Sequence, residues 1–171
     1  MRIVALAILT LAIGCGGPDE VDVSEFRRAG APPAYWLGRS FDGLPLTDAH
    51  TGPGGEPTFV YGTCTPSSDT GCAPPLELQH WPLSRRDPRK FEIAPGEPTP
   101  CRLVGDGRIT AAQFVTTGGT ELYLGDRVVV VFASDERLPA VLRELRALSA
   151  QEPALPHPPA WVNEVLERCE R

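Results

Sequence analysis

The 171-residue sequence predicts an α+β fold: an antiparallel β-sheet (meander) of five to seven strands with one packed helix and a short C-terminal helix, stapled by disulfides. Three observations carry this prediction. Short β-type segments separated by two-residue turns run from 112 to 133. An amphipathic helical segment follows at 135–149. The chain also has five cysteines, enough for internal cross-links.

The meander has the clearest strand signals. Segments 112–117, 120–124 and 127–133 are separated by Gly-Gly and Gly-Asp, which suit tight hairpin turns. The last segment contains Val-Val-Val-Val-Phe and is apolar on both faces, so we expect it inside the sheet. A further strand is expected at 101–104.

Two earlier segments, 58–62 and 76–81, predict a hairpin around the loop that carries Cys64 and Cys72. A short extended piece is expected at 44–46, and the Gly- and Pro-rich segment 51–57 is expected to be an exposed loop.

Two helices are expected near the C-terminus. The first, 135–149, has a leucine-rich stripe and is followed by a proline-rich connector. The second, 160–170, places Trp161 and Cys169 on its apolar side.

The N-terminus has the order of an export signal: Arg2, an apolar run over 3–13, then Gly14 and Cys15. A small residue directly before a cysteine resembles the lipobox of a bacterial lipoprotein. The resemblance implies a signal peptide at 1–14, cleavage before Cys15, and a diacylglycerol thioether on its sulfur, with two or three fatty acyl chains such as palmitate. A transmembrane helix is the alternative, but eleven residues reach only ~16 Å, about half of the hydrocarbon core.

The lipobox implies an extracytoplasmic protein anchored to the cell membrane or the outer membrane through Cys15. Residues 15–33 are rich in Gly, Pro and acids, and predict a flexible tether after the lipidated cysteine. A single extracytoplasmic domain is expected over 34–171. From Tyr35-Trp36-Leu37-Gly38 through the cysteine hairpin to Leu-Tyr-Leu-Gly and the following helix, the chain resembles function-unknown lipoproteins of GC-rich bacteria.

If lipid occupies Cys15, four cysteines remain for disulfides: Cys64, Cys72, Cys101 and Cys169. Three pairings are possible. We prefer Cys64 with Cys72, because a turn-rich loop joins them; Cys101 would then pair with Cys169.

The formal net charge is −6, and no run of consecutive basic residues in the sequence is longer than two. This balance argues against nucleic acid as a partner and against adhesion to anionic lipid. Arginine is plentiful beside the single Lys90, a pattern typical of GC-rich genomes, so the arginine count alone does not indicate phosphate recognition.

No common catalytic signature is present, and we assign no catalytic residue. An envelope hydrolase that combines His50, Asp48 and His80 is one alternative, although polar loop or core-edge roles are the simpler interpretation. A metal or thiol site formed by Cys64, Cys72, His80 and Cys101 is another. Its Cys-x7-Cys spacing is wider than that of usual zinc sites, so disulfides are preferred and no metal or cofactor is expected.

Aromatic residues are the remaining candidates for binding, because Tyr and Trp supply contact area at low entropic cost. The weak candidates are Tyr35, Trp36, His80, Trp81 and Tyr123, against the alternative that most of them belong to the core. Tyr123 is expected on the outer face, since Leu122 and Leu124 point the other way. We therefore expect a non-catalytic binding or scaffold module for an envelope protein, a polymer or a small ligand.

Overall fold

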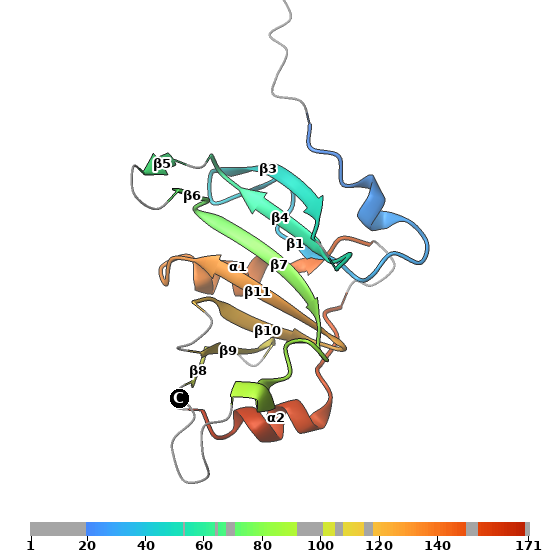
Figure 1. Cartoon of the computed structure of the whole chain (residues 1–171), viewed down its shortest axis with the longest axis vertical. Helices are drawn as coiled ribbons and strands as arrows, with labels where there is room; N and C mark the ends of the chain where they lie inside the picture. The colour runs from blue at the N-terminus through green and yellow to red at the C-terminus, as the bar shows by residue number, and fades with distance from the viewer. Residues whose placement is uncertain are drawn as a thin grey trace, which may run out of the picture.

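The computed structural model describes residues 20–52, 54–63, 65–67, 71–91, 101–104, 108–114, 118–149 and 154–169. Its main element is an eight-stranded sheet with the order β2-β3-β4-β7-β11-β10-β9-β8 (Figure 1). The elements are η1 (Ser24–Arg27), β1 (Tyr35–Trp36), β2 (Ser40–Phe41), β3 (Leu44–Thr51), β4 (Pro57–Tyr61), β5 (Thr65–Ser67), β6 (Gly71–Ala73), β7 (Leu76–Pro82), η2 (Pro88–Phe91), β8 (Cys101–Leu103), β9 (Thr110–Phe114), β10 (Thr120–Leu124), β11 (Arg127–Ala133), α1 (Leu138–Glu144), β12 (Arg146–Ala147) and α2 (Ala160–Leu166). The predicted α+β class is confirmed.

The meander is confirmed: β9, β10 and β11 are consecutive antiparallel neighbours, with Leu122 opposite Val129 and Ala111. Strand β11 lies between β10 and β7, in the interior of the sheet, as its two apolar faces predict. Strands β4 and β7 also pair antiparallel, Phe59 opposite Leu78. The sheet has eight strands where five to seven were expected: β2 is the additional one, and β3 runs from Leu44 to Thr51, beyond the expected 44–46 and into the expected loop.

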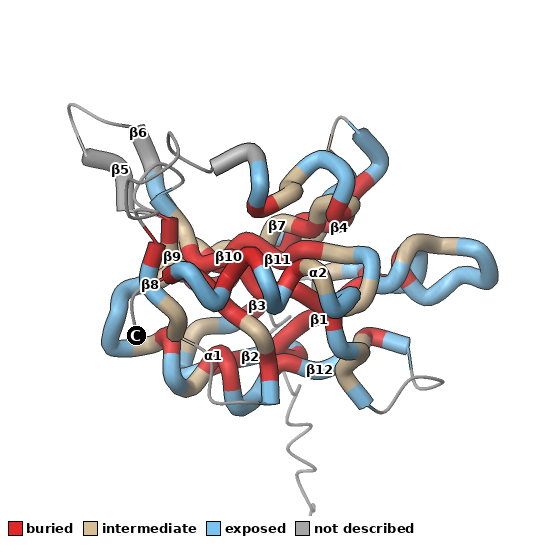
Figure 2. The backbone as a smooth tube through the Cα atoms, turned by 90° about the horizontal axis from the view of Figure 1, so that it is seen from below, coloured by how far each residue is buried: buried red, intermediate tan, exposed pale blue. Residues whose placement is uncertain are grey.

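Both faces of the sheet are covered (Figures 1 and 2). Val129 and Val131 of β11 join a core with α1, β1 and η1, whereas Val128 and Val130 join a core with α2. Strict alternation along a strand sends neighbouring valines to opposite faces, so one strand supplies two cores. The second core is closed by the Cys101–Cys169 disulfide, with an S–S distance of 2.02 Å, which links β8 to the end of α2.

Several boundaries differ from the sequence predictions. The helix expected over 160–170 ends at Leu166. The helix expected over 135–149 ends at Glu144, because Leu145 is extended and Arg146 pairs with Trp36 in β1. The tether expected to continue to Pro33 is ordered on the domain from Glu20: Val23 and Phe26 are buried, and Phe26 packs edge-on against Phe59 at 5.3 Å. Two apolar residues in a polar segment are enough to attach it.

Candidate functional site

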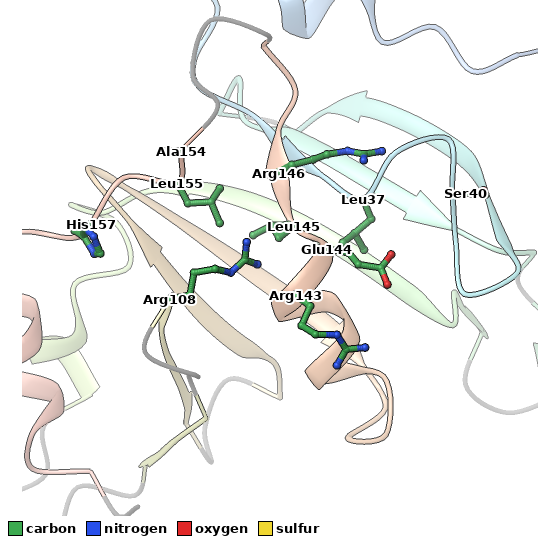
Figure 3. Close-up of a pocket in the computed structure, with 10 residues that line it drawn as sticks. All are labelled: Leu37, Ser40, Arg108, Arg143, Glu144, Leu145, Arg146, Ala154, Leu155 and His157. Atoms are coloured by element: carbon green, nitrogen blue, oxygen red, sulfur yellow. The ribbon is translucent and has the colours of Figure 1, made fainter.

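A polar cavity among the described residues lies where α1 ends and has a volume of about 650 Å³ (Figure 3). We call it the arginine pocket, because Arg108, Arg143 and Arg146 line it, against a single carboxylate, Glu144. Its other lining residues are Leu37, Ser40, Leu145, Ala154, Leu155 and His157. In an acidic chain, this local excess of cations is the feature that points to a ligand.

The local fold explains why these arginines line one cavity, with their guanidinium groups pointing in different directions (Figure 3). The end of α1 at Glu144 places Arg143 in its last turn, and the extended Leu145 then turns the chain so that Arg146 pairs with Trp36 in the β1–β12 ladder. Arg108 lies just before β9, 35 positions earlier than Arg143, and its hydrogen bond to the Leu142 carbonyl brings it to the end of α1. The connector through Leu155 and His157 forms the remaining side.

The arginines are held by backbone groups. Arg108 donates to the carbonyl of Leu142, and Arg143 Nη1 donates to the carbonyl of Pro139 at 3.3 Å. The Leu142 carbonyl lies in the last turn of α1, where partial negative charge favours a cation, whereas Pro139 lies in its first turn. Arg143 and Arg146 form no ion pair with the described part of the chain. Their charge is therefore available to an anion.

Arg146 also lies against Gly38, where a Cβ atom would come within 2.3 Å of Arg146 Nη2. The backbone there is fixed by Tyr61, whose hydroxyl accepts from the Leu37 N–H at 2.9 Å and donates to the Gly38 carbonyl at 3.3 Å. Burial raises the pKa of Tyr61 to about 12, so this phenol stays neutral.

The arginine pocket is suited to binding rather than to proton transfer. Guanidinium groups present planar donor pairs that match carboxylate and phosphate oxygens. No hydrogen bond joins any two of Ser40, Glu144 and His157 in the described structure, so no nucleophile–base pair is assembled among them. Leu37 and Leu145 are buried and provide an apolar floor.

His80 is a satisfied core residue. Its Nδ1 donates to the carbonyl of Pro57 at 2.8 Å, and its Nε2 accepts from the Tyr35 N–H at 2.9 Å. The side chain is buried, and burial lowers its pKa to about 4. The ring is therefore neutral near pH 7, with both nitrogens in use, and neither the hydrolase nor the metal alternative has a free His80.

His50 and Asp48 do lie together, on β3 next to the edge strand β2, with His50 Nδ1 2.8 Å from Asp48 Oδ2. Both side chains are more than half exposed, and neither lines a described cavity. His80 lies on β7, with β4 between it and β3. The structure thus unites two of the three residues of the hydrolase alternative and leaves the third elsewhere.

The aromatic candidates for binding are mostly in the cores. Tyr35, Trp36 and Tyr123 are 1%, 7% and 0% exposed, and Trp81 is half-buried. The expectation that Tyr123 lies on an outer face is wrong. It does point away from Leu122, but α2 covers that face, because the C-terminal helix folds back over it and is fixed there by Cys169.

Tyr123 belongs to a buried polar cluster that motif searching did not reveal. Its hydroxyl donates to Glu121 Oε2 at 2.7 Å, and Arg86 Nη1 donates to Glu121 Oε1 at 3.2 Å. Arg86 also lies over the ring of Trp81, 5.1 Å from its centroid. Burial raises the pKa of Glu121, and burial together with that carboxylate raises the pKa of Tyr123. Arg86, Glu121 and Tyr123 pair with one another here, which is a structural role, whereas the buried Trp81 Nε1 has no hydrogen-bond partner among the described residues.

The metal alternative loses two of its four ligands, because Cys101 is bonded to Cys169 and His80 is hydrogen-bonded on both sides. Among the described residues, no three metal-ligating side chains gather. Cys64 and the side chain of Cys72 lie outside the described residues, so their pairing stays a prediction. Cys15 and its lipidation also lie outside them.

Sequence reasoning did not find the arginine pocket. Arg143 and Arg146 fall on what was expected to be one continuous helix, where they would act as charges at its C-terminal end. The signal that was available is the third arginine, Arg108, but nothing local connects it to the other two. Only the packing of β9 beside α1 brings Arg108 near the other two arginines.

No protein-family model matches the chain, and neither a curated protein nor a solved structure matches it. Within the described residues, no helix is both long enough and apolar enough to cross a membrane.

Proposed function

We propose that this chain is a lipid-anchored, non-catalytic binding module of the cell envelope, and that its arginine pocket captures a small ligand bearing a carboxylate or phosphate group. The gathering of Arg108, Arg143 and Arg146 around one cavity carries the proposal. The chain as a whole is negatively charged, so a cavity with more positive than negative side chains is distinctive.

The anchor part of the proposal rests on Cys15 and the export signal before it. Four residues separate Cys15 from Glu20, where the described structure begins, so the two Cα atoms are at most ~18 Å apart. Because Val23 and Phe26 are packed into the domain, the usable tether is short. The domain would therefore work close to the bilayer surface, where envelope ligands are concentrated.

Intact-mass spectrometry of protein extracted from its native envelope without reductant tests the anchor. The expected mass is that of a chain beginning at Cys15 with a diacylglyceryl group, gaining four hydrogens on reduction. Cys15→Ser should abolish the lipid mass and release the protein from membranes. A wild-type chain that retains Met1 would overturn the anchor.

Calorimetric titration with inorganic phosphate and with succinate tests the pocket. Two charge-assisted hydrogen bonds contribute about 3–6 kcal/mol before the cost of association, so a Kd on the order of 1 mM is expected. The double variant Arg143→Gln/Arg146→Gln should weaken binding at least tenfold. Arg27→Gln/Arg28→Gln is the matched control, because both arginines are exposed and neither lines the pocket. Equal loss in both would show that only overall charge matters and would reject the pocket.

A further inference from the structure

We infer that the ligand of the arginine pocket is an anionic amphiphile, with its head among the arginines and a single alkyl chain in the groove beside them. This inference rests on the proposed function and adds the chemistry of the ligand's other end. The groove lies between β8 and α1, has a volume of about 580 Å³, and is called the β8–α1 groove below. It is lined by Arg102, Leu103, Val104, Asp135, Leu138, Pro139, Leu142 and Arg143.

The groove and the arginine pocket are adjacent. Arg143 lines both, and Arg108 of the pocket donates to the carbonyl of Leu142, which lines the groove. The helix side that borders the groove carries Leu138 and Leu142, one turn apart, so the apolar wall runs along α1 toward its C-terminal end. From Leu138 to Arg143 that wall is about 7.5 Å long.

Charge is distributed unevenly along the groove. At its far end, Arg102 Nη2 donates to Gln113 Oε1 at 2.6 Å, and Gln113 Nε2 donates to Asp135 Oδ1 at 3.2 Å, so both charges there are tied to one amide. At the near end, Arg143 has no acidic partner in the described structure. The middle is aliphatic.

The groove thus has one end where the charges are paired, an aliphatic middle, and at the other end a cation, Arg143, with no acidic partner among the described residues. This arrangement complements an anionic head followed by an alkyl chain. The aliphatic walls are formed by leucine, valine and proline side chains. Burying methylene groups of a ligand against them is favourable, and it requires no particular orientation of the ligand. A lipid-anchored protein held near a bilayer would have such amphiphiles within reach.

Titration with three probes tests the inference: inorganic phosphate, octyl phosphate below its critical micelle concentration, and uncharged octyl glucoside. If about four methylenes are buried, octyl phosphate should bind roughly a hundredfold more tightly than phosphate. Octyl glucoside should bind at least tenfold more weakly than octyl phosphate. Shortening the chain from octyl to ethyl should remove most of the gain.

A pair of matched variants locates the chain. Pro139 and Pro159 are both exposed and both stand at the start of a helix, but only Pro139 lines the groove. An aspartate at a helix start is compatible with folding. Pro139→Asp should reduce the gain of octyl phosphate over phosphate at least tenfold, and Pro159→Asp should leave it unchanged.

The failures are distinguishable. Equal affinities for phosphate and octyl phosphate would overturn the amphiphile and leave the anion site standing. An octyl gain that Pro139→Asp does not alter would place the chain elsewhere and overturn the inference. An acidic octapeptide that displaces octyl phosphate at lower concentration would replace the amphiphile with a peptide ligand. Binding of none of the anions would overturn the proposed function itself.

Discussion

The backbone N–H of Tyr35 donates a hydrogen bond to Nε2 of His80, 45 positions later in the chain, at 2.9 Å. The bond joins β1 to the centre of the sheet, and the two rings stack at a centroid distance of 6.2 Å. Because Nδ1 of the same ring donates to Pro57, one neutral imidazole links three segments of the first core. Protonation would turn the Nε2 acceptor into a donor facing another donor.

This arrangement predicts acid sensitivity. The His80 pKa is about 4 in the folded protein and 6.5 when unfolded, so the unfolded state binds the extra proton between these pH values. Stability should therefore fall by about 3 kcal/mol from pH 6.5 to pH 4. Urea unfolding across this range measures it.

His80→Gln is the comparison for that measurement, since glutamine does not titrate. It should lower stability at pH 7 and flatten the fall toward pH 4. Burial raises the pKa of Glu121, and this affects the pH dependence of stability in the opposite direction. The contribution of Glu121 to stability is lost as pH rises through its pKa in the folded protein. The difference between wild type and variant cancels that contribution. An unchanged pH slope in His80→Gln would contradict the assignment.

Removing Arg86 should destabilise the second core through Glu121. Arg86→Met leaves a carboxylate with 0% exposure and only the Tyr123 hydroxyl as partner, a change that costs about 3 kcal/mol or more. Adding Glu121→Gln to that variant should recover part of the loss, because no buried charge is left. Chemical denaturation of both variants checks this. A double variant less stable than the single one would show that Glu121 is not the cause.

Gly38 should couple the fold to the arginine pocket. It has a φ of +91°, and Gly30 has a φ of +83° with open space around it. Alanine at either position costs about 1–2 kcal/mol for the left-handed backbone. Only Gly38→Ala also displaces the Arg146 guanidinium, so phosphate binding should weaken in that variant and not in Gly30→Ala. Titration of both variants with phosphate separates displacement of the Arg146 guanidinium from backbone strain. Equal phosphate binding by the two variants would show that Arg146 changes its conformation without loss of the site.

The Cys101–Cys169 bond should be a major part of the stability of the second core. It closes a loop of 68 residues, for which the chain-entropy estimate is about 4.4 kcal/mol, an upper value. Replacing both cysteines with serine should lower the free energy of unfolding by about 2–4 kcal/mol. Thermal unfolding of the oxidised wild type and the variant measures the change. Equal midpoints would mean that α2 is held by Val162 and Leu166 alone.

The sequence by itself determined the α+β class, the β9–β10–β11 meander and the burial of β11, because alternation, turn residues and strand length are local properties. It also limited the cysteine pairs to a few, of which the preferred set includes the observed Cys101–Cys169 bond.

Tertiary structure decided which faces are covered. Tyr123 is buried because α2 folds back across the sheet. Val23 and Phe26 are buried because they pack against the first hydrophobic core. The arginine pocket was decided in the same way: the end of α1 at Glu144 follows from the pairing of Arg146 with Trp36, 110 positions apart. Contacts between distant segments carry no local pattern, so packing alone brings Arg108, Arg143 and Arg146 together.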